Sequence, residues 1–206
     1  LFLTQGHVYT SAEECEARFK DEAPGYIYAR FSNPTVAMFE ARMASLEGAE
    51  AARATATGMA AVTSALLGQL KAGDHVVASR ALFGSCRYVI HELLTRFGVE
   101  STMVDGKDLD AWRKAIRPNT KVFFLESPSN PTLEVIDIAA VAQLAHGCDS
   151  KLTVDNVFAT PMQQRPLLLG ADCVVYSATK HIDGQGRCLG GVILASQRSE
   201  EHTSEL

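Results

Sequence analysis

The stretch LTVDNVFATPMQQRPLLLGADCVVYSATK (152–180) contains two short apolar runs, and polar residues stand at the end of each. The first run ends at Asp155, and the second is followed by Ser177, Thr179 and Lys180. Short runs rich in β-branched apolar residues predict buried strands. An open parallel sheet binds its ligands at the carboxyl ends of its strands. We therefore expect chemically active side chains to gather at this end of a sheet.

The chain before this stretch alternates between strand-like and helix-like segments. We predict strands at 75–79, 99–104 and 121–126, and one more at 190–196. Helices are predicted at 57–70, where Thr57 is a candidate N-cap, and at 84–97, 108–116 and 138–146. Such alternation is typical of βαβ units. The sequence thus predicts an α/β fold with a mostly parallel sheet flanked by helices.

The two ends of the chain differ from this pattern. Residues 1–34 are expected to form an extended arm with one short helix near 11–20, and a second helix is expected to begin at the Asn33-Pro34 pair. Residues 35–197 are expected to form the main domain. The tail RSEEHTSEL (198–206) departs from every earlier pattern, and we expect it to be non-native. Because the chain begins with Leu1, we also expect missing upstream sequence.

Composition and charge exclude several classes of protein. The 206 residues are 47% hydrophobic and 21% charged, which allows a sizeable core. The net charge of −5 argues against binding to nucleic acid or to an anionic membrane. No apolar run reaches the roughly 18 residues of a spanning helix. The five cysteines form no CxxC pair and the six histidines show no ligand spacing, so we expect a cytoplasmic protein with reduced thiols and no metal site.

Lys180 and Asp155 are the strongest candidates for chemistry. A deprotonated lysine amine can form a Schiff base with an aldehyde. A carboxylate at the end of a buried strand can keep a pyridine-type ring nitrogen protonated, so that the ring withdraws electrons. Taken singly, each residue also has an ordinary interpretation: Lys180 as a solvated loop lysine, and Asp155 as a turn or cap residue.

Two further segments predict binding of an anion such as phosphate. The amides of Gly58 and Met59 open a predicted helix, where free N–H groups and the helix dipole favour negative charge. Upstream, Tyr28 and Arg30 lie two residues apart in the expected arm and therefore on one side of it, and a guanidinium and a phenol are good phosphate ligands. The alternatives are an ordinary capped helix and a surface pair.

The glycine-rich run at 184–191 is superficially similar to a dinucleotide-binding loop. Such a loop follows a strand and opens a helix, whereas this run follows the Lys180 segment and leads into the strand predicted at 190–196. We therefore interpret it as a flexible or close-packed turn.

Taken together and in this order, the motifs resemble the family of pyridoxal-phosphate enzymes of cysteine and methionine metabolism. The resemblance runs from about residue 1 to residue 197 and is carried by YARFSNPT, ATGM, ESPSNPTLEVIDI, VDNVFATP and SATKHIDGQGR. It implies a fold-type I transferase fold, similar to aspartate aminotransferase, with pyridoxal 5′-phosphate as cofactor. It also implies a further C-terminal domain, which carries an arginine for the substrate carboxylate and which this chain does not reach.

The resemblance assigns roles to individual residues. Lys180 would hold the cofactor as a Schiff base and shuttle protons, Asp155 would pair with the ring nitrogen, and Asn130 would lie near the ring's phenolate oxygen. The phosphate would be bound by Gly58, Met59, Ser177 and Thr179. Tyr28 and Arg30 would reach the phosphate of a neighbouring subunit's cofactor, which implies an obligate dimer within a tetramer.

Within the family, LFGSCRY and IDGQGRCLGG are most similar to the members that make homocysteine from O-succinylhomoserine and sulfide. Many relatives place a tyrosine over the cofactor ring, where this chain has Phe83, which can stack but cannot carry a proton. Phe83 thus agrees with the sulfhydrylase branch. The alternatives are a cystathionine γ-synthase, a γ-lyase and a protein that binds the cofactor without turnover.

Overall fold

The computed structural model describes residues 1–195, which fall into two units. The first unit comprises Leu1–Arg42, and the second begins at Met43. The first contains α1 (Ala12–Phe19) and most of α2 (Pro34–Glu47), whose first residue is the expected proline. The boundary between the units falls inside α2 rather than at residue 34. The tail predicted to be non-native, 198–206, lies outside the described residues.

The second unit is built on a seven-stranded sheet in the order β1-β7-β6-β5-β4-β2-β3. Its strands are β1 (Ala51–Thr55), β2 (His75–Ser79), β3 (Glu100–Val104), β4 (Thr120–Glu126), β5 (Lys151–Asp155), β6 (Cys173–Ser177) and β7 (Gly191–Ala195). The strands from β3 across to β6 pair in parallel, whereas β7 runs antiparallel to both β1 and β6. The predicted α/β class with a mostly parallel sheet is confirmed.

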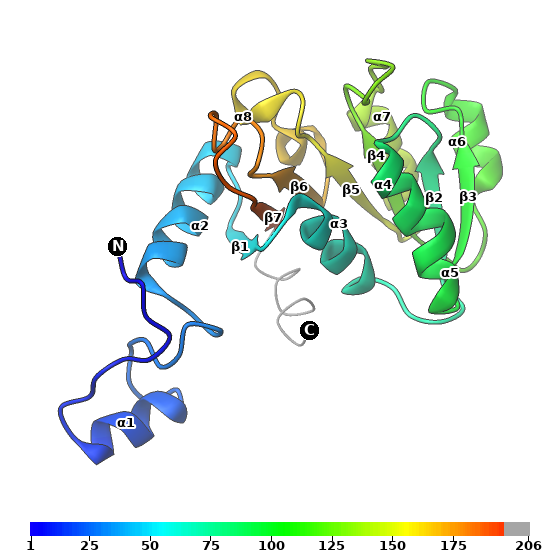
Figure 1. The fold of residues 1–206 in the computed structure, drawn as a ribbon. Helices are drawn as coiled ribbons and strands as arrows, with labels where there is room; N and C mark the ends of the chain where they lie inside the picture. The colour runs from blue at the N-terminus through cyan, green and yellow to red at the C-terminus, as the bar shows by residue number, and fades with distance from the viewer. Residues whose placement is uncertain (196–206) are drawn as a thin grey trace. The chain divides into compact units, whose positions relative to one another are not determined.

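Helices cover both faces of this sheet (Figure 1). α3, α4 and α5 lie on one face, and α6 and α7 lie on the other. Their bounds, with those of the shorter turns, are α3 (Gly58–Leu67), α4 (Gly84–Tyr88), η1 (Val89–Leu93), α5 (Leu94–Arg96), α6 (Leu109–Ala115), α7 (Ile138–His146), α8 (Thr160–Gln163) and η2 (Pro166–Leu169).

The central strand β4 shows why its sequence is almost continuously apolar. Val122 and Phe124 join the core cluster under α3 and α4, whereas Phe123 points to the opposite face and stacks on Trp112 of α6 with ring centroids 5.7 Å apart. A strand covered on both faces has no solvent-facing side. Its last residue, Glu126, is nevertheless a buried carboxylate.

Helix starts follow the expected capping chemistry. Thr57 caps α3, and Asp108 and Asp137 cap α6 and α7, each accepting backbone N–H groups of the first turn. Each cap satisfies donors that the first turn of a helix leaves without partners. These three starts fix where the preceding loops end.

One element was not predicted from the sequence, and one predicted helix needs correction. Residues 51–55 form β1, whose backbone pairs with β7 although its side chains give no strand pattern. The helix expected at 84–97 is interrupted by the π-helical turn η1, which side-chain periodicity does not reveal.

Two properties of residues 1–195 bear on binding. No helix among them is long and apolar enough to cross a membrane. No group of three or more His, Cys, Asp or Glu side chains in this part of the chain could hold a metal ion.

Candidate active site

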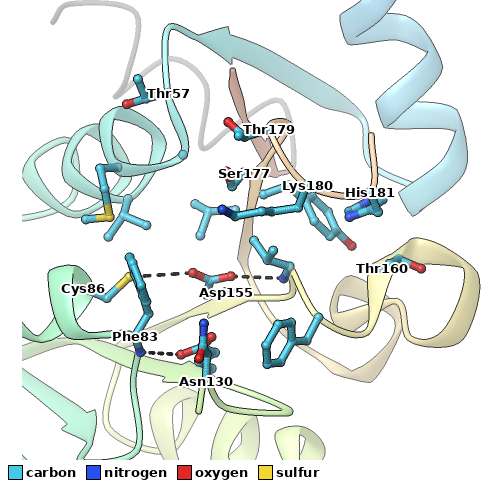
Figure 2. A pocket seen from close by; sticks show the side chains of 18 of the residues that line it. Thr57, Phe83, Cys86, Asn130, Asp155, Thr160, Ser177, Thr179, Lys180 and His181 are labelled. Carbon is cyan, nitrogen blue, oxygen red and sulfur yellow. Dashed lines mark hydrogen bonds between the residues drawn. The ribbon is translucent and has the colours of Figure 1, made fainter. Parts of the chain in front are cut away.

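A cavity of about 580 Å³ opens at the carboxyl ends of β4, β5 and β6 (Figure 2). The start of α3, the Phe83 segment and the loop after β6 complete its walls. Its lining residues are Thr57, Gly58, Met59, Val62, Phe83, Cys86, Glu126, Asn130, Asp155, Val157, Phe158, Thr160, Val175, Tyr176, Ser177, Thr179, Lys180, His181 and Leu189. The cavity therefore lies at the end of the sheet where the strand order and the sequence motifs predict a ligand-binding site.

Eight of the ten residues singled out from the sequence line this one cavity. They come from segments more than a hundred residues apart and are Gly58, Met59, Phe83, Asn130, Asp155, Ser177, Thr179 and Lys180. The two that do not line it, Tyr28 and Arg30, belong to the first unit. Their expected contact with a neighbouring subunit stays a prediction.

Lys180 reaches into the cavity between Ser177 and Asp155 in Figure 2. It is the only lysine or arginine among the residues that line this cavity. Its backbone N–H donates to the Ser177 carbonyl at 3.2 Å, which forms a tight turn directly after β6. The turn at the end of β6 thus fixes the backbone position of Lys180, and its long side chain directs the amine into the cavity.

Asp155 is buried at the end of β5, with 6% of its surface exposed. Burial raises the pKa of its carboxyl group to about 6. Its carboxylate accepts hydrogen bonds from the Val157 N–H at 3.1 Å and from the Cys86 thiol at 3.7 Å. The remaining acceptor capacity of the carboxylate faces the cavity, where a protonated ring nitrogen would be its natural partner.

Glu126 occupies the corresponding position on the neighbouring strand. It pairs in register with Asp155, and burial together with the Asp155 charge raises its pKa to about 7. Its Oε2 accepts the Phe83 N–H at 2.6 Å. Two adjacent strand ends therefore each present a carboxylate beneath the cavity.

The start of α3 provides an anion-binding corner opposite these carboxylates. Gly58 and Met59 occupy the first turn of α3, where backbone N–H groups lack intrahelical acceptors. A Cβ on Gly58 would lie 2.5 Å from the Ser177 Cβ, so only glycine allows α3 to approach the end of β6 so closely. The approach brings two amides and a serine hydroxyl to one corner.

The loop after Lys180 closes the same corner. The Thr179 hydroxyl accepts the Gly190 N–H at 3.2 Å, and the Asp183 carboxylate accepts the Arg187 N–H at 2.7 Å. A Cβ on Gly191 would lie 2.3 Å from the Thr57 carbonyl oxygen, so β7 can start only with glycine here. The glycine run leads into a strand, as expected, and part of its physical role is to let β7 pass the start of α3.

The Tyr28–Arg30 segment differs from the expectation of an extended arm. It forms a turn in which the Phe31 N–H donates to the Tyr28 carbonyl at 2.9 Å. The Arg30 guanidinium lies over the Phe31 ring at 4.5 Å and over the Tyr28 ring at 5.7 Å. The turn therefore replaces the alternation that an extended segment would give, and it brings the guanidinium into cation–π contact with two rings.

Several lining residues were not identified from the sequence. Cys86 lies one helical turn after Phe83, so helix periodicity from Phe83 could have placed it toward the cavity. His181 packs edge-on against Tyr176, and burial lowers the pKa of the imidazole. No periodic signal marks His181, because it stands in an irregular loop.

Behind the cavity lies a buried polar network that also gave no sequence signal. The Tyr176 hydroxyl donates to Glu47 at 2.5 Å and accepts the Asn156 amide N–H at 2.6 Å. Gln164 donates to the Asn156 side chain and to the Ser127 carbonyl. The network thereby ties together the ends of β4, β5 and β6, which carry the cavity residues.

The groups that line the cavity fit pyridoxal phosphate. Lys180 offers an amine for an aldehyde, the Gly58 corner offers amides and hydroxyls for a phosphate, and Asp155 offers a carboxylate for a ring nitrogen. The close approach at Gly58 leaves the corner open where a larger residue would fill it. The three chemical demands of that cofactor are met in one cavity.

Comparisons with known proteins agree with this geometry. The family described as Cys/Met metabolism PLP-dependent enzyme matches residues 1–206. The chain is 53% identical over 197 residues to an O-succinylhomoserine sulfhydrylase of Mycobacterium tuberculosis, covering 96% of this chain and 48% of that protein. It is 45% identical over 198 residues to an L-methionine gamma-lyase of Fusobacterium nucleatum, with 96% and 50% covered.

A solved structure shows the same fold. A protein described as an O-acetylhomoserine (thiol)-lyase of Campylobacter jejuni, solved with N′-pyridoxyl-lysine-5′-monophosphate, superposes with a TM-score of 0.90 at 34% identity. The match covers 98% of this chain and 50% of that one. The chain thus spans about half the length of the relatives it matches. It belongs to the Cys/Met metabolism family of enzymes that depend on pyridoxal phosphate.

Proposed function

We propose that this chain is the cofactor-binding part of an enzyme that replaces the γ-substituent of O-succinyl-L-homoserine with sulfide. The products are L-homocysteine and succinate, so the enzyme serves methionine biosynthesis. The observation that carries the proposal is the convergence of an amine, an anion-binding corner and a buried carboxylate in one cavity. The 53% identity to an O-succinylhomoserine sulfhydrylase supports the choice of substrate.

The cofactor supplies, when bound, an aldehyde for amines and a ring that withdraws electrons from the substrate carbon next to the amino group. Lys180 would hold the cofactor covalently through its Nζ, and as a free amine in the cavity it would take the proton from that carbon. The same amine can return the proton at a neighbouring carbon, because it stays within the cavity. Removal and return of protons by one positioned base is general acid–base catalysis.

Asp155 holds the ring nitrogen in its protonated form. Its burial favours a partner that shares or donates a proton, since an unpaired buried carboxylate is costly. Gly58, Met59, Ser177 and Thr179 would anchor the phosphate, and Asn130 and Phe83 would hold the ring. Val157, Phe158 and Leu189 form an apolar part of the cavity wall.

We further propose that the enzyme is a cytoplasmic homo-oligomer, a dimer of dimers. In it, Tyr28 and Arg30 of one subunit bind the phosphate in the partner's cavity. This assignment would explain why two phosphate-binding side chains stand in the first unit, apart from the cavity residues. Measurement of the mass in solution, with and without Arg30→Ala, tests the assembly and the contribution of the arm to cofactor affinity.

An assay of the natural protein that contains this chain tests the reaction. It is given O-succinylhomoserine with sulfide, O-succinylhomoserine with cysteine, or methionine alone, and the products are separated by chromatography. We expect homocysteine and succinate from the first mixture. Cystathionine as the main product would favour the synthase, and methanethiol from methionine would favour a γ-lyase, the activity in the name of the 45% identical relative.

The non-catalytic alternative has its own outcome in this assay. A protein that binds the cofactor and yet converts none of the three mixtures would refute the enzymatic proposal. Lys180→Ala serves as the negative control. It keeps the cavity and removes the amine of Lys180, the one lysine among the lining residues.

A further inference from the structure

The Phe83–Cys86 segment is attached to the sheet at two points, and both attachments are carboxylates. At its start, the Phe83 N–H donates to Glu126 Oε2 at 2.6 Å. Three residues later, the Cys86 thiol donates to Asp155 Oδ2 at 3.7 Å. Because Glu126 and Asp155 pair in register, both bonds reach the ends of adjacent strands. Figure 2 shows Phe83, Cys86 and Asp155 around the same hollow.

Glu126 makes the stronger of these attachments. The N–H···O distance of 2.6 Å is short for a backbone donor, whereas a contact to sulfur at 3.7 Å is a weak bond. Phe83 is the N-cap residue of α4, and Glu126 is the acceptor for its N–H. Phe83 is 42% exposed, so packing alone holds its ring loosely.

Glu126 is itself a buried side chain, 3% exposed, and its carboxylate bonds to the backbone of a cavity residue from another segment. A buried carboxylate is costly unless hydrogen bonds compensate it, so a glutamate here needs a task that an apolar residue could not perform.

We propose that Glu126 is a positioning residue that sets the Phe83 ring against the bound cofactor. Glu126 acts through the backbone of Phe83 and does not itself touch the substrate. The inference rests on the proposed function only in requiring a cofactor in the cavity. It does not depend on which substrate the enzyme converts.

A double-mutant cycle on the natural holoenzyme tests the inference. Glu126→Leu removes both acceptor oxygens at nearly constant size, and Phe83→Ala removes the ring but keeps the backbone N–H. The readouts are the dissociation constant of pyridoxal phosphate and the visible circular dichroism of the bound cofactor, which reports how asymmetrically the ring is held. Glu134→Gln, at a glutamate outside the cavity, is the control for charge.

We expect Glu126→Leu to weaken cofactor binding about tenfold or more and to reduce the visible dichroic band, since hydrogen bonds to charged acceptors contribute on the order of one to two factors of ten. In the Phe83→Ala background the same change should cost no more than about twofold, because the ring to be positioned is gone. Equal losses in both backgrounds, or no loss in either, would overturn the inference.

Two further measurements keep the test decisive. If Glu126→Leu does not fold, the cycle is run with Glu126→Gln, which keeps one acceptor oxygen; a rise in the dissociation constant of about threefold should then also vanish in the Phe83→Ala background. Hydrogen exchange should be faster at the Phe83 amide in either variant, and unchanged exchange there would contradict the inference. A holoenzyme inert toward O-succinylhomoserine would refute the proposed function and leave these readouts intact.

Discussion

The two ends of the central strands use buried polar groups in opposite ways. At the amino end, His75 is fully buried and both of its ring nitrogens are hydrogen bonded, to Thr120 at 2.8 Å and to Thr102 at 2.9 Å. At the carboxyl end, Asp155 and Glu126 are also buried, but they face a cavity. A polar group whose partners are all internal stabilises the fold, whereas one that keeps a free acceptor can hold a ligand.

The pKa values express the same difference. Burial lowers the pKa of His75 to about 4, so its imidazole is neutral and acts as a fixed bridge between strands. Burial raises the pKa of Asp155 to about 6 and that of Glu126 to about 7, close to the range in which an enzyme works. Perturbation alone therefore does not mark an active site; the adjoining cavity does.

Among substitutions that test this difference between the two ends, Lys180→Ala should have the largest effect. We expect the covalent cofactor absorbance to disappear and turnover to fall by at least about 10³-fold, because one residue supplies both the attachment and the proton transfer. Stability should change little, since Lys180 is directed into the cavity. An unchanged visible spectrum would contradict the role, and Lys151→Ala, at the amino end of β5, is the matched control.

Asp155→Asn should have the next largest effect. The amide keeps the size of the side chain but loses the charge that pairs with a protonated ring nitrogen, so we expect kcat to fall by about ten- to a hundredfold with the cofactor still bound. Turnover is measured together with cofactor content. Equal activity at full cofactor occupancy would show that the carboxyl end, like the amino end, is only structural.

The pH dependence of stability should separate the two ends by sign. The pKa of Glu126 is raised to about 7 in the folded state. The stability that its neutral carboxyl group contributes is therefore fully present below the pKa of the unfolded chain and is lost as pH rises toward about 7. The pKa of His75 is lowered to about 4 in the folded state, so the contribution of His75 to stability rises between pH values of about 4 and 6.5. In the cofactor-free protein, Glu126→Gln should therefore become more stable relative to wild type as pH rises from 5 to 8.

The expected change in that difference is up to about 3 kcal/mol, since one unit of pKa corresponds to about 1.4 kcal/mol. Urea unfolding at a series of pH values measures it. A difference that stays constant with pH would mean that Glu126 has the same pKa in the folded and unfolded states.

Thr120→Val should give the smallest effect and only on stability. It removes a hydrogen-bond partner from a buried ring nitrogen, which costs about 1–2 kcal/mol in the free energy of unfolding. Cofactor affinity and the visible spectrum should match those of wild type. A change in either would show that the amino end of the sheet communicates with the cavity.

Much of the cavity could be predicted from the sequence, because motif residues stand directly at strand ends and helix starts. Asp155, Ser177 and Gly58 are of this kind: each belongs to a predictable element, and the parallel sheet brings their ends together. Glu126 stood at a predicted strand end as well, but only the structure shows that it bonds to Phe83.

The rest depended on contacts between distant segments. The Tyr176–Glu47 bond joins residues 129 positions apart, and no local pattern encodes such a pair. The turn at Tyr28–Arg30 is closed by backbone hydrogen bonds to the Tyr28 carbonyl, which the alternation of side chains does not reveal. The side chains of β1 give no strand pattern, and its place in the sheet follows from its backbone pairing with β7.

The position of β7 has a consequence for biosynthesis. This strand is made after the other six, yet it lies between β1 and β6, pairing Ala51 with Ala195 and Cys173 with the same residue. As the chain emerges from the ribosome, the parallel strands can pair first, but β1 must wait for its neighbour. The anion-binding corner lies beside the ends of β1 and β6, so it can take its final form only after residue 195 has been made.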